Sequence, residues 1–274
     1  MHHYLYAEKV VPHQHVHVTA HMRKMYISCM KPILILLSLL FINIVTHAQQ
    51  QFQFNDDDLV YAVIKDTDGY VNIRNAPSAN SPIVGKIYNH SVFSCESNGT
   101  NWWKVLQVNG SNWIEGYIYK NKVSLLKNWK IISHKNVSTD SAIFKPDNLI
   151  IVVKKRSFHI KQHKLFYHKG NLNENTASYL ERIDGKRFWG TDGEIPKTSI
   201  LSINLLKKGL SIDIPKEAYK DLYEPNLRTL SICSGVENTF YVRMDNSDGA
   251  GAYTIIWIFK DGKYIGRYID DSMV

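Results

Sequence analysis

Cysteine is scarce in this sequence, with three in 274 residues. Cys29 lies before an apolar run near the start of the chain. The lipid-modified cysteine of a lipoprotein follows such a run, so Cys29 is in the wrong place for that modification. Cys95 and Cys233 each lie inside an alternating apolar stretch. Two lone cysteines in such settings are typical of buried, small apolar side chains, and a bridge between them is the alternative that an oxidising compartment allows.

Histidine is absent after His168. A hydrolase of the papain-like class needs a cysteine at the start of a helix, followed later in the chain by a histidine base. Cys233 has no histidine after it, and Cys95 belongs to a run that predicts a strand. The sequence therefore argues against a cysteine hydrolase.

Acidic residues are missing between His159, His163 and His168, where lysines occur instead. The His-Glu-x-x-His pattern of zinc hydrolases is thus absent, and neighbouring cations disfavour a metal ion. Two groups of carboxylates also fall short of a site. Asp192 and Glu194 lie in one short loop, so their spacing does not establish the carboxylate pair of a glycosidase. Asp245, Asn246 and Asp248 lack the later glutamate of a calcium loop. We expect no catalytic site, no cofactor and no metal.

The longest apolar run, residues 32–45, is shorter than the roughly 20 residues that cross a bilayer. Lys24 and Lys31 precede it, and Thr46 and Ala48 supply small residues after it, which is the pattern of a secretory signal peptide. We expect cleavage after Ala48 and a secreted or periplasmic protein with no stable membrane span; a retained anchor is the alternative. Residues 1–21 precede Met22 and are interpreted as an upstream start.

Charge of one sign is not in large excess. The formal net charge of +8 falls to +5 when residues 1–48, with four Lys and Arg and one Glu, are removed. This mild basicity suits contact with anionic cell-wall polymers or lipid headgroups and is also a common solubility charge. It gives no reason to expect nucleic acid as a partner.

Short alternating runs separated by turn residues fill residues 59–126. Five runs between residues 61 and 108 are each followed by Gly, Asn or Pro, which is typical of a small all-β barrel. Residues 49–58, QQQFQFNDDD, are polar and acidic, show no hydrophobic periodicity and predict a flexible lead.

Four segments in this region resemble the bacterial SH3-like domain. They are YVNIRNAPS at 70–78, IVGKI at 83–87, GTNWWKV at 99–105 and GYI at 116–118. The resemblance implies an SH3-like β-barrel with an aromatic groove that is associated with cell-wall peptide. Tyr117 stands where Trp is usual, and the hairpin at 108–115 is longer than the minimum.

Residues 127–274 predict a mostly antiparallel β-rich domain. Longer alternating strands dominate, and residues 215–222 give the one short helix, with Pro215 at its first position. The segments 190–197 and 246–251 resemble only C-terminal regions of exported bacterial proteins, and this resemblance implies no function beyond export.

Two groups of residues are candidates for recognition. Aromatic side chains crowd the first module, where small barrels hold extended ligands; Trp103 and Tyr117 are expected in its core, and the predicted ligand-binding residues are Tyr70, Asn75, Trp102, Trp113 and Tyr119. A basic stretch could bind an anion, although a solvated sheet face is the simpler interpretation; its residues are Lys154, Lys155, Arg156, Lys161 and Lys164.

These patterns predict an exported, non-enzymatic binding protein. Its SH3-like module is expected to recognise cell-wall peptide, peptidoglycan or another envelope ligand. The alternative is a protein-interaction or immunity-type protein that binds an envelope protein through the domain at 127–274. An enzyme of a type without a recognisable motif stays open, because function resides in sites rather than in folds.

Overall fold

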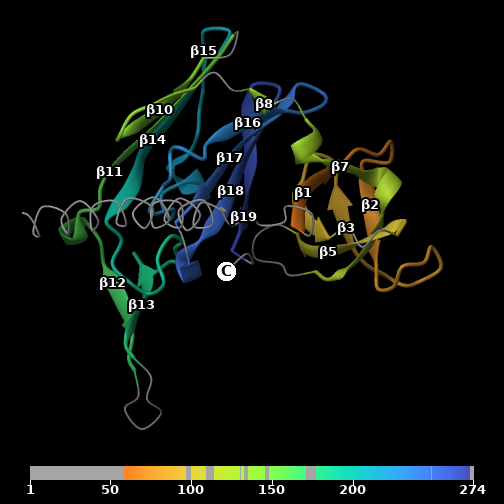
Figure 1. Ribbon diagram of the computed structural model, residues 1–274, viewed down its shortest axis with the longest axis horizontal. Helices are drawn as coiled ribbons and strands as arrows, with labels where there is room; N and C mark the ends of the chain where they lie inside the picture. The colour runs from red at the N-terminus through yellow and green to blue at the C-terminus, as the bar shows by residue number, and fades with distance from the viewer. Residues whose placement is uncertain are drawn as a thin grey trace, which may run out of the picture. The chain divides into compact units, whose positions relative to one another are not determined.

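The computed structural model describes residues 59–96, 100–108, 114–129, 131–132, 135–145, 148–170, 177–247 and 249–271. The predicted signal peptide, the cleavage point after Ala48, the predicted lead and Trp113 lie outside these residues. Residues Asp56–Val274 form one compact unit. The described elements are antiparallel strands joined by turns and short 3₁₀ helices, which confirms the prediction of a mainly β fold (Figure 1).

The first sheet has seven antiparallel strands in the order β3-β2-β6-β5-β4-β1-β7. The five predicted runs are its first five strands. Among the described strands, β3 and β7 stand at the two ends of this order, so closure into an SH3-like barrel stays a prediction. Its elements are β1 (Leu59–Ile64), β2 (Tyr70–Arg74), β3 (Ile83–Tyr88), β4 (Val92–Glu96), β5 (Trp102–Val108), β6 (Gly116–Tyr119), η1 (Lys120–Lys122), β7 (Val123–Leu125) and η2 (Leu126–Asn128).

Alternation along these strands separates a buried face from an outer face, because successive side chains of a strand point to opposite sides. Ile73 of β2, Val105 of β5 and Ile118 of β6 are fully buried. They belong to the first core, which consists of Val60, Ala62, Ile64, Ile73, Ile87, Phe93, Cys95, Val105 and Ile118. The residues between them on β2, β5 and β6 therefore lie on the outer face.

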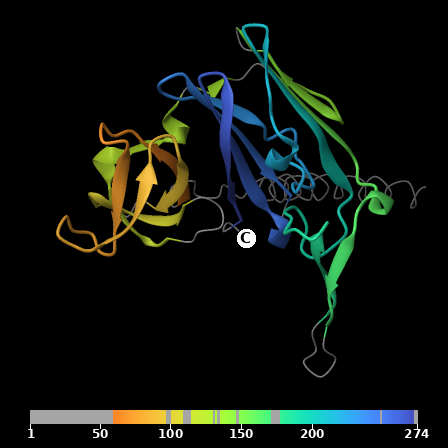
Figure 2. The same ribbon diagram turned by 180° about the vertical axis from the view of Figure 1, so that it is seen from behind.

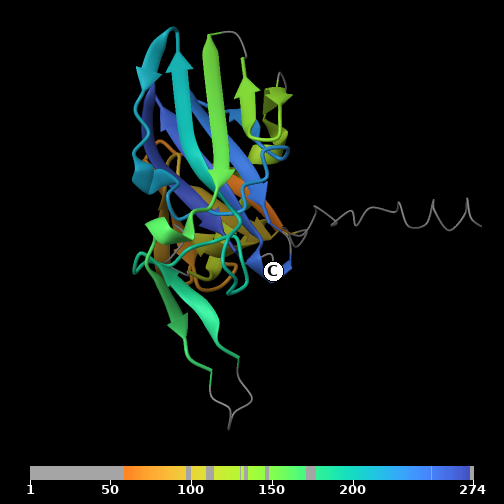
Figure 3. The same cartoon turned by 90° about the vertical axis from the view of Figure 1, so that its left-hand side faces the viewer.

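Two five-stranded antiparallel sheets follow, in the orders β15-β14-β11-β10-β9 and β19-β18-β17-β16-β8. They enclose a common core that includes Phe144, Ile151, Leu205, Val242 and Trp257, and Figures 2 and 3 show the two sheets layered on each other. The strands are β8 (Ile131–Ile132), β9 (Lys135–Val137), β10 (Ser141–Phe144), β11 (Leu149–Ser157), β14 (Thr198–Lys207), β15 (Leu210–Ile212), β16 (Ser231–Ser234), β17 (Thr239–Asn246), β18 (Tyr253–Lys260) and β19 (Lys263–Asp270).

A separate hairpin of β12 (Leu165–His168) and β13 (Tyr179–Ile183) projects beyond these sheets (Figure 3). Its base packs through Leu180 and Ile183 against Tyr223. The predicted antiparallel character of residues 127–274 is thus confirmed for the strands that the structure describes.

The predicted short helix at 215–222 is wrong in type. The segment contains a single 3₁₀ turn, η5 (Lys216–Ala218), and Tyr219 leaves helical geometry with φ −152°. One turn is too short to stabilise an α-helix by itself. The carbonyl of Ala218 also accepts a hydrogen bond of 2.8 Å from the buried Trp257 indole, so packing on the common core holds this segment.

A third core, here called the joining core, connects the first sheet with β16 to β19. It contains Tyr61, Val63, Val92, Leu126, Cys233, Tyr241, Ile256, Ile258 and Tyr268. The Tyr268 hydroxyl donates to Ser94 Oγ at 3.0 Å, with both residues buried. Strands β1 and β4 are therefore buried on both faces, which accounts for their largely apolar sequences, in which Ser94 is a buried polar residue. The predicted domain boundary after residue 126 stays a prediction.

His90 links the same two regions and gives the fold a pH dependence. Its Nε2 lies 2.7 Å from Lys260 Nζ and 3.1 Å from Glu237 Oε2. Burial and then the Lys260 charge lower the pKa of His90, against the opposing effects of Glu237 and Asp261. As the pH falls, His90 therefore takes up a proton in the unfolded chain near the ordinary histidine pKa of about 6.5, and in the folded chain only at lower pH.

We expect the free energy of unfolding to fall as pH drops below about 6.5. The matched control is His90→Asn, because asparagine tolerates the positive φ of 68° at this position. Urea unfolding between pH 5 and pH 8 measures the free energy of unfolding of the unaltered protein and of the His90→Asn variant. A slope between pH 6.5 and pH 5 that is the same in both would contradict this assignment.

Cys95 and Cys233 are both free and buried, in the first core and the joining core respectively. Burial raises the pKa of Cys95 to about 12 and also raises that of Cys233. Because the thiolate is the reactive species, both thiols should be inert in the native protein. We expect Ellman's reagent to modify neither until denaturant is added, and rapid modification of the native protein would show that this packing is wrong.

Candidate functional site

The outer face of the first sheet carries a row of aromatic side chains. On β2 the buried Ile73 alternates with Tyr70, Asn72 and Arg74, which lie on the opposite face. Tyr70 pairs in register with Tyr88 of β3, and their ring centroids are 6.2 Å apart. Tyr88 is 60% exposed, so this pair is open to solvent. Cross-strand pairs of this kind also stabilise the sheet.

A second aromatic pair lies on the same face two strands away. Trp102 of β5 pairs in register with Tyr119 of β6, with ring centroids 5.5 Å apart in an edge arrangement. The link to β2 is the register pair of Arg74 with Tyr117. Since Tyr117 and Tyr119 share a face of β6, all the outer residues of β2, β5 and β6 line one surface. We call the surface formed by Tyr70, Tyr88, Trp102, Tyr117 and Tyr119 the aromatic face.

Polar groups are interspersed with these rings. The ammonium group of Lys86 lies 3.9 Å from the centre of the Tyr70 ring, a cation–π contact. Lys104 lies opposite Tyr117 and forms an ion pair of 2.8 Å with Glu115. The Asn72 side-chain oxygen is buried and accepts no hydrogen bond from the described residues. A buried acceptor without a donor costs stability, so Asn72 is a residue that stability alone does not favour.

Three of the predicted ligand-binding residues meet on the aromatic face: Tyr70, Trp102 and Tyr119. Asn75 is exposed and begins the loop after β2, where its backbone N–H donates to the Pro82 carbonyl at 3.0 Å. Trp113 lies outside the described residues. The sequence analysis missed Tyr88, although the alternation of Lys86 and Tyr88 at the end of β3 carries the signal.

The expected core positions divide between two outcomes. Trp103 packs against the first core, as predicted. Tyr117, which was also predicted for the core, is half-buried on the aromatic face. The reason is that Gly116 and Ile118 take the inward positions of β6, and a Cβ at Gly116 would lie 2.4 Å from Ile73.

The predicted anion-binding residues are spread over several elements. Lys154 and Lys155 are consecutive on β11 and point to opposite faces of it, with Lys154 and Arg156 exposed and Lys155 half-buried. Lys161 lies in η3 (Ile160–Gln162), and Lys164 follows it. His163 Nδ1 lies 2.7 Å from Asp184 Oδ2, and its ring stacks on Phe158. The described residues contain no group of three or more His, Cys, Asp or Glu that could hold a metal ion.

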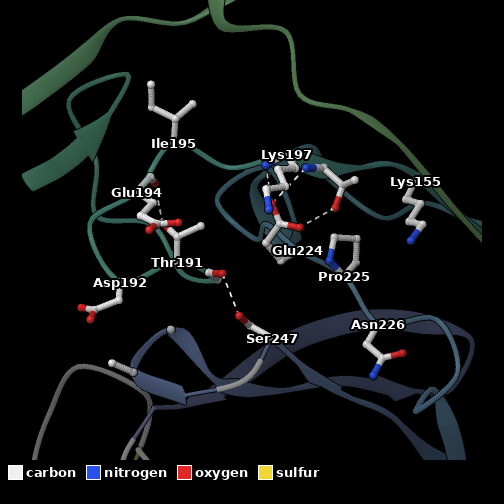
Figure 4. A pocket seen from close by; sticks show the side chains of 14 residues that line it. Lys155, Thr191, Asp192, Glu194, Ile195, Lys197, Glu224, Pro225, Asn226 and Ser247 are labelled. Carbon is white, nitrogen blue, oxygen red and sulfur yellow. Dashed lines mark hydrogen bonds between the residues drawn. The ribbon is translucent and has the colours of Figure 1, made fainter.

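A pocket of about 780 Å³ lies at one end of the two five-stranded sheets (Figure 4). Three loops and Lys155 form its walls; the loops contribute Gly190, Thr191, Asp192, Glu194, Ile195, Lys197 and Thr198, then Glu224, Pro225 and Asn226, then Ser247, Ala250 and Gly251. The segments 190–197 and 246–251, to which the sequence assigned no role, thus meet here. Asp192 and Glu194 lie in one wall.

Two glycines permit the close approach of these loops. Gly190 has φ +118°, and a Cβ there would lie 2.3 Å from the Tyr223 carbonyl oxygen. At Gly251 a Cβ would lie 2.8 Å from Thr191 Cα. The Ser247 hydroxyl donates to the Gly190 carbonyl at 2.9 Å and joins the first loop to the third. Only residues without a side chain fit where backbones come this close.

Glu224 braces a wall of this pocket. Its carboxylate accepts hydrogen bonds of 3.0 Å from both the backbone N–H and the hydroxyl of Thr198, and a third from the Lys197 backbone N–H. The Glu224 backbone is in the left-handed region with φ 48°. This carboxylate is therefore occupied by the protein itself, unlike those of Asp192 and Glu194, which accept no hydrogen bond and form no ion pair with the described residues.

No protein-family model, curated protein or solved structure matches the chain. In the part of the chain that the structure describes, no helix is long and apolar enough to span a bilayer.

Proposed function

We propose that this protein is an exported, non-enzymatic binding protein whose aromatic face holds an extended peptide or glycan of the cell envelope. The observation that carries the proposal is the register of β3, β2, β6 and β5, which lines up two ring pairs on the surface opposite the first core. We also propose that residues 59–126 are an SH3-like barrel, on the sequence segments that resemble that domain.

The chemistry of the aromatic face suits such a ligand. Two of its rings, Tyr88 and Tyr119, are exposed and the other three are half-buried. Such rings offer broad apolar area at little loss of side-chain entropy, since each has only two rotatable side-chain bonds. The ammonium group of Lys86 on the same surface can bind a carboxylate or carbonyl oxygen of a peptide, whereas Lys104 is paired with Glu115 and Arg74 donates to the Ser81 carbonyl. A row of rings with polar groups between them fits a chain that repeats along its length better than a compact ligand.

The envelope location rests on the predicted signal peptide. If residues 1–48 are removed on export, the remaining chain has a net charge of +5. That charge favours approach to anionic wall polymers by long-range attraction and adds little binding free energy at physiological salt.

Recognition of an envelope protein through residues 127–274 is the second candidate. Its support is the exposed apolar side chains on β14 and β15, with Leu210 75% exposed and Leu201 and Leu206 also exposed. Exposed apolar surface of this kind marks protein contacts in some proteins. Copurification of one stoichiometric protein would favour this candidate over wall binding.

The direct test is sedimentation of the protein lacking residues 1–48 with insoluble peptidoglycan at low and moderate salt. We expect cosedimentation that changes little between the two salt concentrations, because ring contacts are not screened. The whole of residues 49–274 should be used, since a fragment ending at Leu126 would expose the joining-core residues Tyr61, Val63 and Val92. No cosedimentation at either salt concentration would contradict the proposal.

A further inference from the structure

The pocket in Figure 4 has charged groups of opposite sign at its two ends. Lys155 projects from β11 at one end, and Glu194 lies at the other with Asp192 beside it; Lys197 lines the wall between them, next to Glu224. Among the described residues, neither Lys155 nor Glu194 has an ion-pair partner, so both charges are available. Charges that the fold does not pair, on opposite sides of one cavity, indicate a ligand with two charges.

The rest of the lining narrows the ligand class. Thr191, Ser247 and Asn226 supply neutral hydrogen-bonding groups, and Pro225 and Ile195 supply small apolar surfaces. None of the described residues that line this pocket has an aromatic ring that could stack on a nucleobase or a large flat ligand. The volume of about 780 Å³ lies within the range of roughly 300–1,000 Å³ that is usual for small-molecule sites.

The walls are also fixed in position before any ligand arrives. Glu224 is held by Thr198, Ser247 is held by Gly190, and the Thr191 hydroxyl donates to the Glu194 carbonyl at 2.6 Å. The Asn226 backbone N–H donates to Asn246 Oδ1 at 2.9 Å. Preformed walls reduce the entropy that binding costs.

We propose that this pocket binds the free ends of a short peptide, with its α-amino group toward Glu194 and Asp192 and its carboxylate toward Lys155. A peptide of a few residues carries one charge of each sign at its two ends, as the pocket requires, and its backbone amides match the neutral polar lining. This site is separate from the aromatic face and does not depend on the wall-binding function.

The test is isothermal titration of the protein lacking residues 1–48 with unblocked tri-alanine. The same peptide with an acetylated amine, and with an amidated carboxyl group, serves as the comparison. Loss of one charge-assisted contact should weaken binding about tenfold. We therefore expect tri-alanine to bind and each blocked peptide to bind about tenfold more weakly.

Two variants assign each end of the peptide. In the double variant Asp192→Asn/Glu194→Gln, which removes both carboxylates of that end, acetylation should cause no further loss, and in Lys155→Gln, amidation should cause none. The matched controls are Lys154→Gln, whose side chain lies on the opposite face of β11, and Glu181→Gln on β13, and both should bind as the unaltered protein does. Circular dichroism checks that each variant is folded.

Three results would overturn the proposal. The first is absence of heat with unblocked tri-alanine and with unblocked Ala-Lys-Ala and Ala-Glu-Ala at millimolar concentration. The second is equal affinity for blocked and unblocked peptides. The third is an unchanged response to blocking in both pocket variants. Since the aromatic face is intact in all of these proteins, peptidoglycan sedimentation of the same samples distinguishes this failure from failure of the proposed function.

Discussion

The Gly190→Ala variant is expected to lose about 2–5 kcal/mol of unfolding free energy. A Cβ at this position would lie 2.3 Å from the Tyr223 carbonyl oxygen, so backbone must move. Overpacking of this kind costs about 1–3 kcal/mol, and the φ of +118° adds about 1–2 kcal/mol for any residue with a side chain. Urea unfolding followed by circular dichroism measures the loss.

Gly209→Ala is the matched control. Gly209 also has a positive φ, +79°, but a Cβ there would have no atom within 4 Å. This variant should lose only the conformational part, about 1–2 kcal/mol. Equal losses in the two variants would mean that the close approach of the 190 loop to Tyr223 is not a feature of the folded protein.

The Trp102→Ala variant is expected to bind peptidoglycan about 30-fold more weakly, with a loss of about 1 kcal/mol of stability from the cross-strand pair with Tyr119. Aromatic side chains at the centre of a binding surface commonly contribute about 2 kcal/mol, which corresponds to this factor. Trp102 lies on the outer face and contacts Tyr119, so its loss leaves the first core intact. Sedimentation over a range of peptidoglycan concentrations measures the apparent affinity.

Tyr88→Ala should also weaken binding, because Tyr88 belongs to the other ring pair of the aromatic face, with Tyr70. Tyr167→Ala is the control: it removes a ring of similar exposure from the β12–β13 hairpin, away from the aromatic face. Loss of binding in Tyr167→Ala that matches the loss in Trp102→Ala would place recognition elsewhere.

The strands of the first sheet could be predicted because their signals are local. In Tyr70–Arg74 and Trp102–Val108, apolar and polar residues alternate with the period of a strand, and turn residues follow each run. The strand position of Trp103 also predicted its place in the core, against which it packs. The same reasoning misplaced Tyr117, because only the contact of Gly116 with Ile73 decides which residues of β6 face the core.

The helix at 215–222 was predicted from a local signal that a distant contact overrides. Pro215 and the following Lys, Glu and Ala favour a helix start. The indole of Trp257, about 40 positions later in the chain, binds the Ala218 carbonyl and fixes the segment on the common core after one 3₁₀ turn. No pattern within the segment reports this contact.

The pocket could not be predicted from the sequence for a related reason. Glycines in the segments 190–197 and 246–251 were visible, but turns, bulges and close backbone approach use the same residues. Gly190 opposite Tyr223, and Gly251 opposite Thr191, are pairs that only the folded chain brings together. Lys155 of β11 likewise lines the pocket together with loops that lie far from it in the sequence.

The central claim is that the aromatic face is the recognition surface, and a nitrogen-15 NMR titration with soluble peptidoglycan fragments tests it most directly. We predict that shift changes concentrate on the backbone amides of β2, β3, β5 and β6 and on the Trp102 indole, and that they saturate with added fragment. No shift changes at all, or changes confined to residues 127–271, would contradict the account.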